Sequence, residues 1–253
     1  MLGISMSAIG MLSIVGMIVS NDAYGPIVDN ARGLAEMGDL GDEVIERADE
    51  LDSAGNTTKA ITKGFAIGAA GLTVIALLAA FAEIVSSTTG EIITFDLMNP
   101  SVFFGALVGV AIPAVFSAIL IFGVNKNSQK LVSEIHRQFK EIKGIKEGTA
   151  QPEYAKCINL ATLGAMTELI PAGLSAIIST LIVGFVGGVQ AIGGFLAGNI
   201  LSGLLLAMLM SNSGGLWDNA KKYIEAGNFG GKGSEAHKAA VIGDTIGDPF
   251  KDT

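Results

Sequence analysis

The chain has 253 residues, half of them hydrophobic, and its mean hydropathy is +0.54. Only 16% of the residues are charged, against roughly 25% in soluble domains, so the composition indicates a membrane protein. The net charge of −8 excludes nucleic acid as a partner, and one cysteine with two histidines leaves no intrachain disulfide and no cysteine- or histidine-based zinc site.

The first half of the chain predicts three membrane-spanning helices separated by polar segments. Residues 1–20 are apolar, lack the features of a signal peptide, and can span a bilayer if they continue upstream. The acidic stretch from Glu36 to Asp52 contains two Gly-Asp turn signals. A second span is expected at about 60–86, a polar loop at 87–100 and a third span at about 101–124.

The second half predicts one helix that protrudes into water and three further helices. Residues 125–157 are charged and amphipathic, which is typical of a helix that protrudes into water. A fourth span at about 158–186, kinked at Pro171, leads through a glycine-rich turn at 184–194 to a fifth span that ends near Met210. A sixth helix begins at about residue 235. We therefore expect an all-α integral membrane protein with about six transmembrane helices, a single domain over residues 1–253 cut from a longer chain at both ends.

The basic residues predict the topology. Of the 16 lysines and arginines, four lie in 32–63, seven in 126–156 and five in 221–251, whereas none lies in 87–100 or 184–194. Positive charge marks the cytoplasmic loops of membrane proteins. The sequence therefore predicts a multi-pass protein, in the inner membrane if the source is a bacterium, with its charged clusters on the cytoplasmic side.

Glycines recur at the spacing that lets membrane helices approach closely. Pairs separated by three residues occur at Gly64/Gly68, Gly105/Gly109, Gly184/Gly188 and Gly194/Gly198. We interpret them as packing contacts. The glycine-rich segment 227–233 lacks the Gly-Lys-Ser/Thr of a phosphate-binding loop, and we interpret it as a connection between helices.

Three acids near the end of the chain are the clearest functional signal. Asp244, Asp248 and Asp252 are spaced four residues apart, which stacks their carboxylates on one face of a helix. Aligned acids repel one another unless divalent cations neutralise them, so the spacing suggests oxygen ligands for Mg²⁺ on a phosphate substrate. Further ionisable or polar residues lie at predicted helix ends, where they are costly and usually functional: Asp22, Asp29, Asn56, Lys63, Asp218, Lys221 and Lys251. The charged stretches 36–52 and 126–146 are interpreted as solvated faces.

Four strings resemble the membrane-integral, ion-translocating pyrophosphatases. They are DAYGPIVDN at 22–30, GNTTKAITKG at 55–64, WDNAKKYIE at 217–225 and GKGSEAHKAAVIGDTIGDPFKDT at 231–253. The resemblance implies sixteen transmembrane helices in an inner ring of six and an outer ring of ten, assembled as a homodimer in the lipid bilayer. The present chain resembles the last six helices, cut inside the final one.

The resemblance also implies roles for individual residues. It assigns Mg²⁺ binding to Asp29, Asp218 and Asp248, and substrate binding to Lys221, Lys251 and Lys63. Asp252 corresponds to one of two aspartates that position the attacking water, and Asp244 to a further acid of the site. Asn56 and Lys63 line the site on the neighbouring helix, with Asp22 nearby. Cleavage of a phosphoanhydride needs this combination of charge neutralisation and a base beside an in-line water.

Lys59 discriminates between branches of that family. In the potassium-dependent branch the corresponding string reads Gly-Asn-Thr-Thr-Ala-Ala-x-Gly-Lys-Gly, whereas here Lys59 and Thr62 replace an alanine and a glycine. A tethered ammonium can supply the positive charge of a diffusible K⁺. The resemblance therefore implies a potassium-independent proton pump.

Two departures from the family pattern are evident. Arg32 stands where the family usually has glycine, and a second acid-rich pair of helices with half the metal ligands is absent from this sequence. We expect Mg²⁺-dependent hydrolysis of pyrophosphate coupled to proton translocation in the full-length protein, and no activity from this chain alone. A non-hydrolytic cation transporter or channel and an inert product of a degraded gene are the alternatives.

Overall fold

The computed structural model describes residues 1–252, with side chains described as far as Lys251. Over this range the chain forms helices and no strand. The helices are α1 (Leu2–Leu12), α2 (Val15–Met37), α3 (Asp42–Thr89), α4 (Pro100–Glu141), α5 (Tyr154–Glu225) and α6 (Glu235–Asp252), with a short 3₁₀ helix, η1 (Asn228–Gly230), before α6. The predicted all-α fold is confirmed.

Several helices are longer than the spans expected from the sequence. α3 begins inside the acidic stretch, directly after the turn at residues 38–41, and continues through the predicted second span. α4 passes without a break from the third span into the charged segment and ends at Glu141. Residues 142–153 form a loop instead of the helix expected through 157. Helix therefore continues from the apolar spans into water, because charged residues with good helix propensity follow the spans directly.

The helices change direction at two breaks, one between α1 and α2 and one inside α5. α1 and α2 meet at a bend of 51° around residues 13–14, so the first predicted span is a bent pair of helices. α5 contains one residue with non-helical dihedral angles, Gly188 (φ 70°, ψ −169°), where the helix reverses direction. Only glycine adopts such angles without strain. The reversal lies inside the glycine-rich turn predicted at 184–194, whereas the backbone keeps helical dihedral angles at Pro171.

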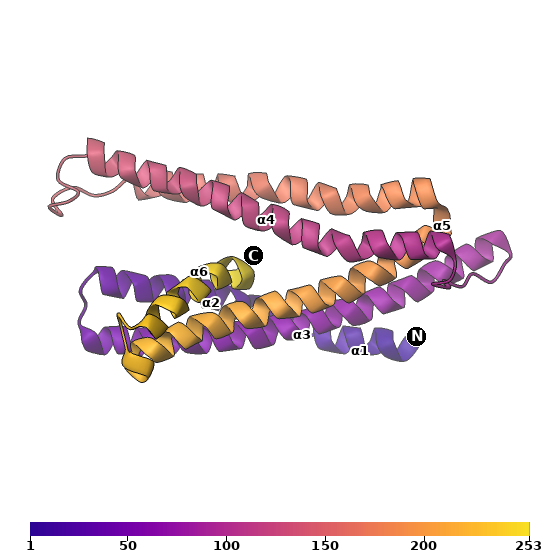
Figure 1. Ribbon diagram of the computed structural model, residues 1–253, viewed down its shortest axis with the longest axis horizontal. Helices are drawn as coiled ribbons and strands as arrows, with labels where there is room; N and C mark the ends of the chain where they lie inside the picture. Colours follow the sequence, from indigo (N-terminus) through magenta and orange to yellow (C-terminus); the bar gives the residue numbers. More distant parts are fainter. Residues whose placement is uncertain (253) are drawn as a thin grey trace.

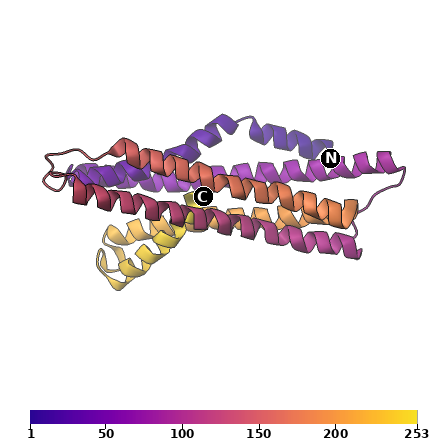
Figure 2. The ribbon, with the colours of Figure 1, turned by 90° about the horizontal axis from the view of Figure 1, so that it is seen from above.

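The helices lie in two groups (Figure 1). α4 and the first arm of α5 run antiparallel as one group, and the second arm of α5 returns beside α3, with α2 and α6 close by. Figure 2 shows α6 and the end of α5 projecting from one side, away from α1. The connections 38–41, 142–153 and 226–234 lie at one end of the bundle, and the connection 90–99 and the reversal at Gly188 lie at the other.

The outer surfaces are suited to a bilayer. α3, α4 and α5 are each long and apolar enough to cross a membrane, and α1 with α2 makes a fourth candidate if the bent pair is one span. Large apolar side chains remain exposed along these helices, among them Phe122 (69%) and Leu205 (69%). An apolar surface of this extent is costly in water, so the structure supports a multi-pass membrane protein.

Glycines bring α4 and α5 into close contact, as the sequence predicts for two of the four pairs. A Cβ atom on Gly105 would lie 1.9 Å from the carbonyl oxygen of Ala191, and one on Gly194 would lie 1.9 Å from that of Val102. Gly109 and Gly198 make similar backbone contacts. These two pairs are confirmed as packing positions because no larger residue fits there.

The other two pairs make fewer close contacts between residues 1 and 252. A Cβ atom on Gly184 would lie 2.8 Å from Ile192 Cδ1 on the second arm of α5. A Cβ atom on Gly64 would meet nothing within 4 Å, and one on Gly68 would make only ordinary contact with Met11. Gly188 serves the reversal of α5 instead of a contact. The described chain thus places no close helix contact at Gly64, Gly68 or Gly188.

Candidate functional site

One face of α3 presents a stripe of polar side chains to the interior. Asp52, Asn56, Lys59 and Lys63 are spaced four, three and four residues apart, which places them on one side of a helix. Asp52 is 0% exposed, and Asn56 and Lys59 are each 3% exposed. Polar groups with this degree of burial are stable only when they have partners, and the partners come from α2, α5 and α6.

Asp218 of α5 lies at the centre of these contacts and is 2% exposed. Its Oδ2 atom accepts a hydrogen bond from Asn56 Nδ2 at 2.8 Å and another from the Lys251 ammonium. Its Oδ1 atom accepts a hydrogen bond from Lys222, one helical turn further along α5. Helices α3, α5 and α6 therefore converge on one buried carboxylate.

Asp244 and Asp248 of α6 complete a cluster of three carboxylates with Asp218. Each offers an oxygen atom, and the three atoms lie within 4.8 Å of one another. Lysines alternate with these acids, because Lys221 pairs with Asp244 and Lys251 Nζ lies 3.0 Å from Asp248 Oδ1. The Oδ1 atom of Asp244 is buried and has no hydrogen-bond partner among the residues described. Three carboxylates with an unsatisfied oxygen fit a hard divalent cation such as Mg²⁺.

Glycines allow α5 and α6 to approach closely enough to form this cluster. A Cβ atom on Gly214 would lie 2.5 Å from the carbonyl oxygen of Gly247 and 2.7 Å from Lys251 Cβ. Trp217 packs over the same crossing, with its ring 6.1 Å from that of Phe250. The crossing places Lys251 beside Asp218, which follows Gly214 by one turn.

Lys63 connects the site to α2. Its ammonium donates to the backbone carbonyl of Lys251 and lies 3.5 Å from Asp22 Oδ1. Asp29 lies two turns beyond Asp22 on α2 and is half-buried. Asp29, which the resemblance assigns to Mg²⁺ binding, is not part of the three-carboxylate cluster. Asp244, which the resemblance gives only as a further acid of the site, is part of it.

Lys59 is enclosed by α2. A Cβ atom on Gly25 would lie 2.9 Å from Lys59 Cδ and 3.5 Å from its Nζ atom, so the lysine stem fills the space that glycine leaves. The Thr62 hydroxyl donates back to the carbonyl oxygens of Thr58 and Lys59. At 3% exposure Lys59 is an interior residue and not a solvated lysine at a helix end.

Two further predictions concern Asp252 and Arg32. The side chain of Asp252 lies outside the described residues, so its proposed role in water activation stays a prediction. Arg32 joins α2 to α3, since its Nε atom lies 2.7 Å from Asp49 Oδ1 and its other nitrogen pairs with Glu36. The bulky charge at this position is thus neutralised by acids on both sides.

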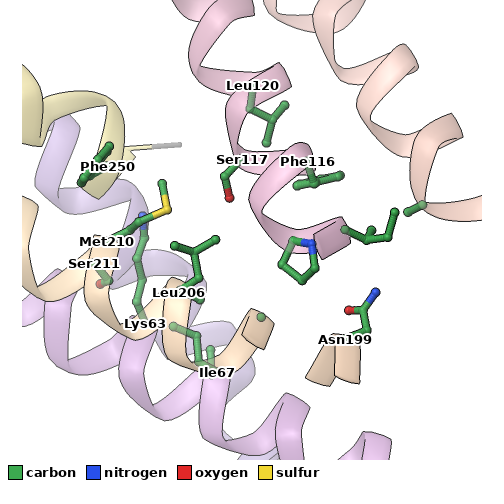
Figure 3. Close-up of a pocket in the computed structure, with 16 residues that line it drawn as sticks. Lys63, Ile67, Phe116, Ser117, Leu120, Asn199, Leu206, Met210, Ser211 and Phe250 are labelled. Carbon is green, nitrogen blue, oxygen red and sulfur yellow. The ribbon is translucent and has the colours of Figure 1, made fainter. Parts of the chain in front are cut away.

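A cavity of about 450 Å³ borders the site on its apolar side. Figure 3 shows Lys63, Met210, Ser211 and Phe250 on one side of it and Phe116, Ser117 and Leu120 of α4 on the other. The lining is mainly apolar, so the cluster of acids and lysines is separated from the α4 layer by a region with little capacity to stabilise charge.

Two residues that our sequence predictions did not assign to the site lie inside it. Asp52 is fully buried, and Lys222 joins it to Asp218, with Nζ 2.8 Å from Asp52 Oδ2. Asp52 lies in the stretch 36–52, which the sequence analysis interprets as a solvated face, and Lys222 received no role from the sequence. The spacing of Asp52 from Asn56 would have indicated its position, because a residue one turn before a buried polar residue shares its helix face.

The model of the family described as inorganic H⁺ pyrophosphatase matches residues 1–253. The chain belongs to this family. It is 50% identical over 251 residues to a K⁺-insensitive pyrophosphate-energized proton pump of Methanosarcina mazei, and the match covers 99% of this chain and 37% of that relative. A proton pump of the same description from Chloroflexus aurantiacus is 48% identical over 262 residues, with 99% and 34% covered. The chain thus spans about a third of the length of these pumps.

Sequence identity alone does not separate the ion preferences within the pyrophosphatase family. A K⁺-stimulated pyrophosphate-energized sodium pump of Thermotoga maritima is 48% identical over 259 residues, covering 99% of this chain and 36% of the relative. This value equals that of the Chloroflexus proton pump. The distinction must therefore come from individual residues.

Proposed function

We propose that this chain forms part of a membrane pump that hydrolyses inorganic pyrophosphate with Mg²⁺ and uses the energy to translocate protons. The observation that carries the proposal is the cluster in which Asp218, Asp244 and Asp248 alternate with Lys221 and Lys251 at a buried helix crossing. Carboxylates suit Mg²⁺ and lysines suit phosphate oxygens, so the mixture fits a metal-bound polyanion better than a passing cation. A cation channel would be obstructed by these lysines.

The residues have distinct parts in the proposed reaction. Asp218, Asp244 and Asp248 would hold Mg²⁺ together with Asp29 from α2 and further ligands from the rest of the pump. The metal would supply neutralisation of the charge on the phosphate groups. Lys221 and Lys251 move from their carboxylate partners to the phosphates, while Asn56 and Lys63 keep Asp218 and the end of α6 in place. Asp252 accepts a proton from the attacking water.

We propose that the pump exports protons without needing K⁺ and that its site faces the cytoplasm. Lys59 and Thr62 distinguish this chain from the potassium-dependent string, and the burial of Lys59 beside Gly25 supports a tethered charge inside the site. The lysine-rich connections at one end of the bundle support a cytoplasmic location for that end. The full-length pump is expected to be a homodimer.

The test compares a full-length pump with the 253-residue chain. The full-length pump is the natural protein that contains this chain, or a chimera in which it replaces the matching 251 residues of the Methanosarcina relative. We expect Mg²⁺-dependent phosphate release from pyrophosphate by the full-length pump and none from the chain alone, which holds only part of the ligand shell.

The replacement Asp252→Asn tests the chemical step in the same assay. The amide keeps the shape of the side chain but does not accept the proton of the attacking water, so phosphate release should fall by about 10²–10⁴-fold. Near-normal turnover of Asp252→Asn would remove this residue from the mechanism. Phosphate release by the 253-residue chain alone would show that the other ligands are dispensable.

A further inference from the structure

Asp52 is a buried acid for which the proposed reaction has no direct use. It is 0% exposed, yet it does not belong to the three-carboxylate cluster. Neither of its oxygen atoms has a hydrogen-bond partner within the described chain, and Oδ2 forms an ion pair with Lys222, whose Nζ atom lies 2.8 Å away. A buried carboxylate is costly unless its charge is used, so its position beside the site needs a reason.

Lys222 links Asp52 to the cluster. Its ammonium contacts Asp52 on α3 and Oδ1 of Asp218 on α5, and its side chain is 10% exposed. The other oxygen of Asp218 is held by Asn56 and Lys251. Both oxygens of the central carboxylate are therefore held by donors, and Lys222 is the nearest cation to Oδ1.

Lys222 has competing partners on its outer side. It also lines a cavity of about 810 Å³ that we call the acidic mouth, whose carboxylates come from α3 and the end of α5: Asp42, Glu46, Asp49, Glu50 and Glu225. A flexible lysine can turn toward these acids at little cost. The electrostatic attraction between the Asp52 carboxylate and the Lys222 ammonium opposes that movement. This attraction is strong because the two groups are buried in a region of low dielectric constant.

We propose that Asp52 is a positioning residue that holds Lys222 inward, so that Lys222 orients Asp218 for binding Mg²⁺. Without Asp52, the Lys222 ammonium turns into the acidic mouth and Oδ1 of Asp218 loses its donor. Removing a residue that contacts a metal ligand, but not the metal itself, typically weakens metal binding by about 10–100-fold. The inference rests on the proposed function, because it concerns the same site.

The experiment measures how Mg²⁺ with imidodiphosphate, a non-hydrolysable analogue of pyrophosphate, raises the thermal unfolding temperature of the detergent-solubilised full-length pump. Ligand binding to the folded state stabilises it, so the Mg²⁺ concentration for half of the maximal effect reports apparent affinity. We expect Asp52→Ala to raise this concentration by about tenfold or more. Asp52→Asn keeps an acceptor oxygen and should give a smaller increase, which preserves the test if Asp52→Ala does not fold. Glu43→Gln is the matched control and should have no effect, because Glu43 is an exposed acid of α3 that pairs with Arg47 and does not line the acidic mouth.

A double-mutant cycle with Lys222→Met separates positioning from a structural role. Once Lys222 is absent, Asp52→Ala should raise the Mg²⁺ concentration by less than about twofold, since the two residues act in series. Equal shifts in both backgrounds, or a lower metal-free unfolding temperature with an unchanged Mg²⁺ requirement, would overturn the proposal. Tighter Mg²⁺ binding in Lys222→Met would also overturn the proposal. It would show that Lys222 affects Mg²⁺ binding at Asp218 only by repelling the ion, and not by orienting the carboxylate. Absence of any Mg²⁺ effect in the unsubstituted pump would count against the proposed function instead.

Discussion

At the scale of single residues, the site is built from buried ion pairs in which each side chain has a neighbour of opposite charge. Asp218 is held by Asn56, Lys222 and Lys251, and Lys221 holds Asp244. Truncating one member of such a set leaves a buried charge unpaired, which is more damaging than the loss of an exposed pair. Replacements at these positions should therefore affect both stability and ligand binding.

Lys59 provides the sharpest prediction at this scale. If its ammonium replaces K⁺, the full-length pump should hydrolyse pyrophosphate equally well with and without potassium. Lys59→Ala should lower activity in potassium-free buffer, and added K⁺ should restore it more effectively than Na⁺, because an open site of oxygen ligands selects by fit and field strength. Titrating phosphate release with each salt measures this.

The double variant Lys59→Ala with Thr62→Gly is the more complete test, because Thr62 lies one turn from Lys59 on the same helix. Glu50→Gln serves as the control for removing a charge from α3. A flat potassium titration in both lysine variants would reject the tethered-cation interpretation and leave the ion preference open.

The residue scale also shows where sequence analysis succeeded. The spacing of Asp244 and Asp248 predicted that they share a face, and they do meet Asp218. Asp52 was missed although its spacing from Asn56 places both on one face of α3, because the acidic stretch 36–52 does not itself show where α3 becomes buried. Lys222, on α5, contacts Asp52 across the same boundary. That boundary depends on the crossing of α3 and α5, which is a tertiary contact and not a local property of either segment.

At the scale of helices, glycines determine which elements can meet. Gly214 lets α6 lie against α5, with a Cβ atom at this position 2.5 Å from the backbone of Gly247. A methyl group meeting backbone atoms cannot be accommodated by a rotamer change, so α6 must move. Gly214→Ala should therefore displace Lys251 and Asp248 from Asp218, weaken Mg²⁺ stabilisation by about tenfold and lower phosphate release.

Gly173→Ala is the control, because a Cβ atom at Gly173 on the first arm of α5 would have no atom within 4 Å in the described chain. Both variants are measured by thermal unfolding with and without Mg²⁺. If Gly214→Ala bound Mg²⁺ as well as the control does, the α5–α6 crossing would not be what positions the acids.

Helix boundaries show the limits of sequence patterns at this scale. Apolar windows located the spans, and the glycine-rich turn predicted at 184–194 contains Gly188, where α5 reverses, but the windows did not reveal that α4 continues without a break into the charged segment. A proline fits into a membrane helix when neighbouring groups satisfy the freed carbonyl. A glycine in a run of glycines is where a sharp reversal costs least, which sequence spacing alone does not distinguish from a packing contact.

At the scale of the whole molecule, lysines lie in the connections at one end of the bundle, whereas the connection 90–99 and the reversal at Gly188, at the other end, carry no lysine or arginine. Positive charge at 126–156 and 221–251 predicts a cytoplasmic location for the first end. In a Cys157→Ser background of the full-length pump, a cysteine at Glu147 should react with a membrane-impermeant thiol reagent in inside-out vesicles. A cysteine at Glu91 should react only in right-side-out vesicles, and the reverse pattern would invert the topology.

The central claim is that this chain supplies one part of a site that couples pyrophosphate hydrolysis to proton movement. The most direct measurement is acidification of inside-out vesicles that contain the full-length pump, followed with a pH-sensitive dye after addition of Mg²⁺ and pyrophosphate. We predict acidification without added Na⁺ or K⁺, and its loss together with phosphate release in Asp218→Asn. Phosphate release without acidification, or acidification that persists in Asp218→Asn, would contradict this account.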